Sequence, residues 1–95
     1  MKKKTIAILG STGSIGQTTL QIIKETNKFK VILIIANTNY VKIVSQIKIF
    51  KPKIVIINDL KTYTKIKQIN KYKKTIFLNS IIDIKKYIKK INITV

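Results

Sequence analysis

Three evenly spaced glycines are the residues of this sequence most suited to binding a ligand. They lie in the segment Gly10-Ser11-Thr12-Gly13-Ser14-Ile15-Gly16, which places two residues between successive glycines. A glycine at the end of a strand permits a tight turn, a second lets the backbone approach a pyrophosphate, and a third lets the next helix pack closely on the strand. The free N–H groups at the start of that helix attract phosphate. This spacing predicts a dinucleotide-binding turn, and the alternative is a turn needed only for packing.

The segment Asn37-Thr38-Asn39 is the second candidate site, because it follows the next expected strand about twenty residues beyond the glycines. Enzymes that prefer NAD carry a carboxylate there, which binds the ribose 2′-hydroxyl. This segment has no Asp or Glu, and its amides and hydroxyl can donate hydrogen bonds to a 2′-phosphate. The segment therefore favours NADP over NAD. The alternative is that these residues only form a turn and cap a helix.

Short apolar segments alternate with amphipathic ones along the chain. Four segments are short, apolar and mostly β-branched, as strands buried on both faces are: residues 5–9, 31–35, 54–57 and 75–78. Apolar stripes at three- or four-residue steps predict a helix after each strand. The stripes are Ile15, Thr19 and Ile22; Ile43, Ile47 and Phe50; Ile66 and Ile69; and Ile81, Ile84, Ile88 and Ile91.

This alternation predicts a fold of the α/β class. The expected architecture is an incomplete, Rossmann-like, doubly wound parallel sheet with the order βαβαβαβα and the start of a fifth strand at residues 93–95. Right-handed crossovers should place the first three strands in the order third, second, first, with the strand at 75–78 beyond the third at the sheet edge. Asn58-Asp59 and Asn79-Ser80 follow two of the strands and can cap the next helices.

The net charge of +17 raises the alternative of a small basic module that binds nucleic acid. All 20 basic residues are lysine and are spread from Lys2 to Lys90, whereas a nucleic-acid footprint is clustered. We therefore expect solvated helix faces and no specific nucleic-acid partner.

No membrane span is expected, because the longest apolar run, residues 31–36, is far shorter than the roughly 20 residues that cross a bilayer. With no cysteine and no secretory leader, a cytoplasmic location is the default expectation.

The glycine segment and its surroundings resemble the 1-deoxy-D-xylulose 5-phosphate reductoisomerase family of the methylerythritol phosphate route to isoprenoids. The matching positions are Ile8 to Gly16, Thr19-Leu20, the strand at 29–36, Asn39 and Lys51-Pro52-Lys53. The resemblance extends over essentially the whole chain. It implies that residues 1–95 are a truncated, N-terminal, NADPH-binding domain of such an enzyme, without its catalytic and C-terminal domains.

The resemblance also implies which residues contact NADPH. Those implied at the pyrophosphate are Gly10, Thr12, Gly13, Ser14 and Ile15. Those implied near the adenosine phosphate are Asn37, Thr38 and Asn39. Members of the family often have glycine at the first of these three positions and lysine, arginine or serine at the second, so only Asn39 matches the pattern there.

The family's reaction needs more than these 95 residues. It rearranges the carbon skeleton of a sugar phosphate and reduces the product with NADPH, on magnesium or manganese held by acidic residues of a later domain, and its members are typically homodimers. Glu25, Asp59 and Asp83 are placed to interact with helix ends, so we assign no residue to catalysis or metal binding. We expect the chain alone to be inactive. Another NADP-linked reductase, such as a semialdehyde dehydrogenase, is the enzyme alternative.

Overall fold

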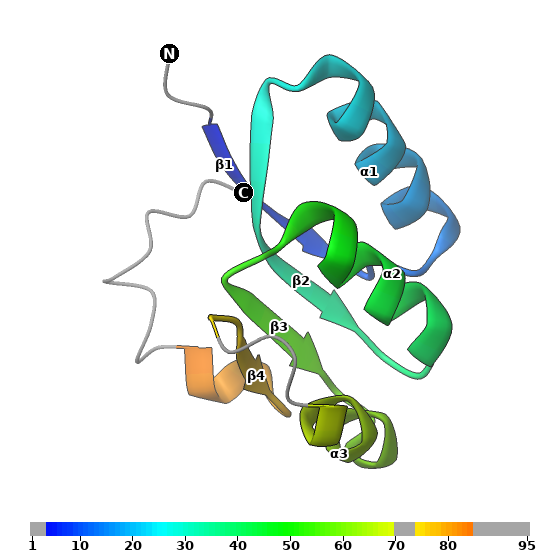
Figure 1. Ribbon diagram of the computed structural model, residues 1–95, viewed down its shortest axis with the longest axis vertical. Coiled ribbons are helices and arrows are strands. Elements are labelled where there is room, and N and C mark those ends of the chain that lie inside the picture. The colour runs from blue at the N-terminus through cyan, green and yellow to red at the C-terminus, as the bar shows by residue number, and fades with distance from the viewer. Residues whose placement is uncertain (1–3, 70–73, 85–95) are drawn as a thin grey trace.

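Strands and helices alternate in the computed structural model, which describes residues 4–69 and 74–84 (Figure 1). The strands are β1 (Lys4–Leu9), β2 (Phe29–Ala36), β3 (Ile54–Ile57) and β4 (Ile76–Leu78). The helices are α1 (Ser14–Thr26), α2 (Tyr40–Phe50) and α3 (Leu60–Ile69), followed by the short 3-10 helix η1 (Ile81–Ile84). The expected strands at 5–9, 31–35, 54–57 and 75–78 are confirmed, although some begin or end a residue or two away from the predicted position.

The strands form one parallel sheet in the order β1-β2-β3-β4, and their arrows in Figure 1 point the same way. This order confirms the expectation from consecutive right-handed crossovers, with β4 at the edge beyond β3. Leu9 of β1 pairs with Ile35 of β2, which in turn pairs with Ile56 of β3. The carboxyl ends of these strands are therefore level, so the segments that follow them lie along one edge of the sheet.

The α-helices of the described ranges cover one face of the sheet. The core on this face joins residues of all three helices to strand residues: Ile8, Leu20, Ile23, Val31, Ile34, Ala36, Ile43, Ile47, Val55, Ile57 and Ile66. A second buried group consists of strand residues alone: Ala7, Ile32, Leu33, Ile35, Ile54 and Ile56. Strands with apolar residues buried on both faces are typical of parallel sheets, as the sequence predicted.

The buried stripe of α1 corrects one prediction. We expected Ile15, Thr19 and Ile22 to face the core, but Ile15 is 84% exposed and Ile22 is 54% exposed. The helix instead buries Gly16, Leu20 and Ile23, one position farther along. A Cβ on Gly16 would collide with the carbonyl oxygen of Gly10. The helix can approach the turn only through this glycine, and that contact fixes its rotation.

The other predicted stripes have different outcomes. Ile43, Ile47 and Ile66 are buried in the core, with Phe50 and Ile69 half-buried beside them, which confirms the stripes of α2 and α3. The fourth stripe begins in η1, where Ile81 is 53% exposed. Its remaining positions, Ile88 and Ile91, and the expected strand at 93–95 lie outside the described residues, as does the side chain of Ile84.

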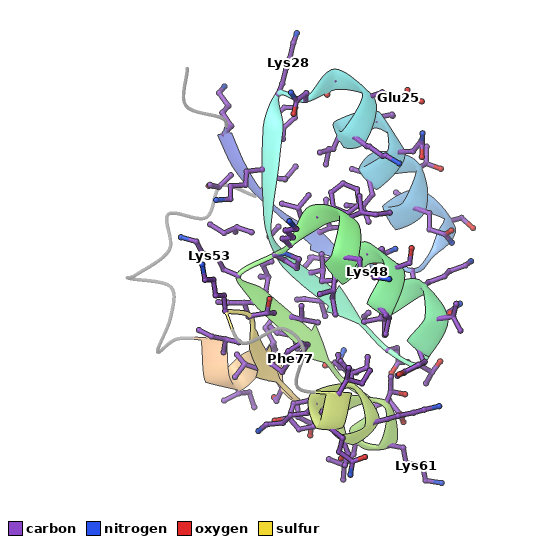
Figure 2. All side chains as sticks on the ribbon, in the orientation of Figure 1. Glu25, Lys28, Lys48, Lys53, Lys61 and Phe77 are labelled. Carbon is purple, nitrogen blue, oxygen red and sulfur yellow. The ribbon has the colours of Figure 1, made fainter. Side chains whose placement is uncertain are left out.

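The lysines come from many elements of the fold. Figure 2 labels Lys28 between α1 and β2, Lys48 on α2, Lys53 just before β3 and Lys61 on α3, and all four are exposed. These four lysines of the described ranges lie on or next to separate elements, as expected of solvated surfaces. Within residues 4–69 and 74–84, no helix is long and apolar enough to cross a membrane.

Candidate dinucleotide-binding site

The first glycine makes the turn out of β1. Gly10 has a φ of 69°, in the left-handed region that residues with a side chain rarely adopt. Its carbonyl oxygen accepts a hydrogen bond from the Gly13 N–H at 3.0 Å. The Ser11 N–H donates to the Ile35 carbonyl of β2, also at 3.0 Å. The chain therefore leaves β1 in a tight turn that stays attached to β2.

The second and third glycines are constrained differently. Gly16 has no room for a Cβ, because the backbone of Gly10 and Ser11 lies against it. A Cβ on Gly13 would meet only the Gly10 carbonyl oxygen, at the ordinary contact distance of 3.4 Å. Gly13 also has a φ of −75°, which any residue adopts. The fold itself thus tolerates a side chain at Gly13, so a requirement for glycine there would come from a ligand.

Free backbone donors gather where α1 begins. The first hydrogen bond of the helix joins the Gln17 N–H to the Gly13 carbonyl at 2.9 Å. The N–H groups of Thr12, Ser14 and Ile15 have no acceptor in the part of the chain that the structure describes. The first turn of α1 contains no acidic residue, so its partial positive charge is not compensated locally. Such a helix start can bind a pyrophosphate.

Asn37, Thr38 and Asn39 are exposed where β2 ends. Asn39 caps α2, because its Oδ1 accepts a hydrogen bond from the Lys42 N–H at 3.2 Å. The capping interpretation is therefore confirmed for Asn39, while its Nδ2 has no acceptor among the described residues. Since β1 and β2 are neighbours, the structure brings this segment and the glycine turn to adjacent strand ends. All eight residues implied to contact NADPH lie along this edge of the sheet.

The acidic side chains that the structure describes lie apart, with Asp59 at the start of α3 and Glu25 in the last turn of α1. The Asp59 Oδ2 accepts hydrogen bonds from the Thr62 hydroxyl at 2.7 Å and the Thr62 N–H at 3.0 Å, at the start of α3. These bonds hold the pKa of Asp59 below its usual value. Glu25, labelled in Figure 2 at the far end of α1, accepts from Gln21 at 3.0 Å. The side chain of Asp83 lies outside the described residues.

A cation site is not formed by these side chains. The described ranges contain no group of three or more His, Cys, Asp or Glu residues that could hold a metal ion. Hard cations need several converging oxygens, which Asp59 and Glu25 on separate helices do not supply.

Two glutamines that support the turn were not predicted from the sequence. Gln46 of α2 donates from Nε2 to the Ser11 carbonyl at 2.7 Å, and Gln17 of α1 donates to the Thr12 carbonyl at 2.8 Å. A contact between residues 35 positions apart leaves no local pattern in the sequence. The available signal was a polar residue three positions after Ile43, on the buried stripe of α2.

Parallel strands in the order β1-β2-β3, helices on one face and a glycine turn leading into α1 define the first half of a Rossmann-like dinucleotide-binding fold. The family model for 1-deoxy-D-xylulose 5-phosphate reductoisomerase matches residues 6–94. The chain belongs to this family.

Individual relatives agree with the family match. The 1-deoxy-D-xylulose 5-phosphate reductoisomerase of Clostridium novyi is 51% identical over 65 residues, which make up 67% of this chain and 17% of the relative. That of Pelagibacter ubique is 49% identical over 61 residues, covering 63% of this chain and 16% of the relative. This chain thus spans about a sixth of the length of these relatives.

Solved structures resemble the fold as well. The Zymomonas mobilis reductoisomerase in complex with NADPH is 28% identical, with a TM-score of 0.73 over 81% of this chain and 21% of that one. A reductoisomerase in complex with NADPH, fosmidomycin and magnesium is 24% identical, with a TM-score of 0.79 over 95% of this chain and 22% of that one. At that identity the second likeness concerns the fold alone.

Proposed function

We propose that residues 1–95 form the N-terminal NADPH-binding domain of a 1-deoxy-D-xylulose 5-phosphate reductoisomerase, with the pyrophosphate held at the glycine turn. The observation that carries this proposal is the group of free N–H donors at Thr12, Ser14 and Ile15, directly after the left-handed turn at Gly10. The space beside Gly13 lets a phosphate approach the backbone. The NADPH complex of the relative from Zymomonas mobilis supports the choice of ligand.

The residues present fit the two ends of the adenosine half of the cofactor. Gly10, Thr12, Gly13, Ser14 and Ile15 would surround the pyrophosphate. Asn37, Thr38 and the Nδ2 of Asn39 would donate hydrogen bonds to the 2′-phosphate, since these side chains are exposed at the end of β2. When bound, NADPH supplies the hydride of the family's reaction.

The preference for NADPH over NADH rests on the charge of the same segment. No carboxylate follows β2 to bind a ribose 2′-hydroxyl or repel a 2′-phosphate. The first turn of α2, which follows the segment directly, contains Lys42 and no acidic residue. The preference is therefore expected even though the segment contains no cation of its own.

The activity of the whole enzyme is part of this proposal. Skeletal rearrangement and reduction of the sugar phosphate would require further domains, a magnesium or manganese ion and, in the manner of the family, a homodimer. The described side chains do not form a group that fits such a metal ion. A cytoplasmic location remains a prediction from the cysteine-free sequence.

Calorimetric titration of the chain with NADPH and NADH tests the proposal. A chain with a charge of +17 can attract any anion, so the titration should be made at about 0.15 M salt, where surface attraction is screened. The proposal predicts saturable binding of one NADPH per chain, tighter than that of NADH. Equal or tighter binding of NADH would contradict the assignment of the 2′-phosphate segment.

A further inference from the structure

A buried hydrogen bond joins α2 to the glycine turn. The Gln46 Nε2 donates to the Ser11 carbonyl at 2.7 Å, although 35 positions separate the two residues. Ser11 is fully buried and Gln46 is 8% exposed. The bond therefore lies inside the layer where α2 packs on the sheet and is shielded from competing water.

The same two residues carry unsatisfied polar atoms. The Ser11 Oγ and the Gln46 Oε1 are both buried and have no hydrogen-bond partner in the described part of the chain. Buried polar atoms without partners are destabilising and are uncommon in native cores. An apolar pair would pack between α2 and the sheet without this cost, so stability alone does not explain the two polar side chains.

The geometry of the peptide bond between Ser11 and Thr12 suggests what the contact does. No peptide bond in the described ranges is cis, and in a planar trans peptide the C=O and the following N–H point in opposite directions. Gln46 draws the Ser11 carbonyl toward the buried side of the turn. The Thr12 N–H must then point away from α2, toward the open side of the turn, where it has no acceptor among the described residues.

We propose that Gln46 is a positioning residue for the dinucleotide, which fixes the Ser11–Thr12 peptide so that the Thr12 N–H faces the pyrophosphate. This inference rests on the proposed NADPH site. Gln46 touches no phosphate itself, and it acts through the Ser11 carbonyl. The Ser11 N–H to Ile35 hydrogen bond holds the preceding peptide, and the Gln17 to Thr12 carbonyl hydrogen bond holds the following one. Gln46 is the side chain that bonds to the Ser11–Thr12 peptide itself.

The contact also couples the two halves of the site. Asn39 caps the start of α2, and Gln46 lies seven residues later, roughly 10 Å along the helix axis. One rigid helix thus carries the segment proposed for the 2′-phosphate and the group that orients the pyrophosphate turn. A shift of α2 would disturb both parts of the site together.

The test compares Gln46→Met with Gln68→Met in the full chain. Methionine keeps the length of glutamine but cannot donate to Ser11, and Gln68 is an exposed glutamine of α3 that serves as the matched control. NADPH affinity is measured by calorimetry, and the Thr12 amide resonance is followed by NMR. We expect Gln46→Met to weaken NADPH binding about tenfold and to abolish the shift of the Thr12 amide on binding, with Gln68→Met unchanged.

The possible outcomes separate this inference from the proposed function. Unchanged NADPH affinity and an unchanged Thr12 shift in Gln46→Met would overturn the positioning role alone. A wild-type chain that binds no NADPH would overturn both the site and the positioning role. If Gln46→Met does not fold, Gln46→Leu removes the amide donor without burying a charge, and the NADPH affinity and Thr12 shift of that variant are compared in the same way.

Discussion

At the residue scale, the three glycines of the turn have three different physical reasons to be glycine. Gly10 needs a positive φ, and Gly16 needs the absence of a Cβ against the Gly10 carbonyl. Gly13 needs neither, because its backbone is ordinary and its nearest neighbour would lie 3.4 Å from a Cβ. Substitutions can therefore separate a requirement of the fold from a requirement of the ligand.

The first prediction concerns Gly13→Val. We expect helix content and melting temperature to stay close to the wild type, while NADPH affinity falls more than about tenfold because a side chain occupies the place of the phosphate. Circular dichroism and calorimetric titration measure the two effects. Gly16→Ala is the contrasting variant, and it should lose about 1–3 kcal/mol of stability through overpacking against the Gly10 backbone. A folded Gly13→Val chain that binds NADPH normally would show that the phosphate lies elsewhere.

The second prediction concerns Thr38→Glu. A carboxylate beside the exposed Asn39 would repel a 2′-phosphate, so NADPH affinity should fall at least about fivefold, while NADH affinity stays the same or rises. Thr38→Gln, which has similar size and no charge, is the control. The ratio of the two dissociation constants is the measurement, and a ratio equal to that of the wild type would count against 2′-phosphate recognition by this segment.

At the scale of elements, the spacing of the apolar residues and their place along the chain predicted most of the fold. The apolar runs identified all four strands, and the rule for right-handed crossovers gave their order. The stripes of α2 and α3 were found because Ile43, Ile47 and Ile66 follow the helical period. The glycine spacing likewise placed the candidate site at the start of α1.

The predictions that failed did so for physical reasons that the spacing of apolar residues along the sequence cannot reveal. Two overlapping stripes run along α1, and the choice between them depends on the close contact of Gly16 with Gly10, a tertiary contact. The Ser11 to Gln46 hydrogen bond likewise joins distant residues. Of the expected capping pair Asn79-Ser80, Ser80 is confirmed, because its Oγ accepts from the Ile82 N–H of η1 at 3.2 Å. Asn79 does not cap the helix, and its Nδ2 donates to the Ile57 carbonyl at 2.9 Å.

The third prediction concerns the cap of α3. Hydrogen bonds from Thr62 lower the pKa of Asp59 in the folded chain, so the carboxylate form favours folding. This contribution is present above the pKa that Asp59 has in the unfolded chain and is lost as the pH falls through the folded value. Asp59→Asn should therefore lower the melting temperature at pH 7 and have less effect at pH 3. Thermal unfolding at both pH values measures this, and an equal effect at both would contradict a charge-dependent cap.

At the scale of the whole molecule, the candidate site lies along one edge of the sheet, where neighbouring strands end. The chain spans 17% of the Clostridium novyi relative, and its described residues form no cation site. The lysines that Figure 2 labels lie on or next to different elements of the described structure. Cofactor binding is the part of the proposed function that we predict for this chain.

The fourth prediction is that the 95-residue chain turns over no substrate. Mixed with 1-deoxy-D-xylulose 5-phosphate, NADPH and magnesium or manganese, it should oxidise no NADPH above the control without protein, because its described side chains bring together no carboxylates that could hold a polarising cation. Absorbance of the reduced nicotinamide is the measurement. Measurable turnover would mean that the catalytic groups lie within this chain.

The most direct test of the central claim is a map of the backbone amide resonances of a ¹⁵N-labelled chain titrated with NADPH at about 0.15 M salt. If the glycine turn holds the pyrophosphate, the largest shifts will fall on Thr12, Ser14 and Ile15, whose N–H groups lack acceptors in the described structure, with further shifts at Asn37 to Asn39. Shifts confined to the lysine-bearing faces of α2 and α3, or no saturable shifts at the turn, would contradict it.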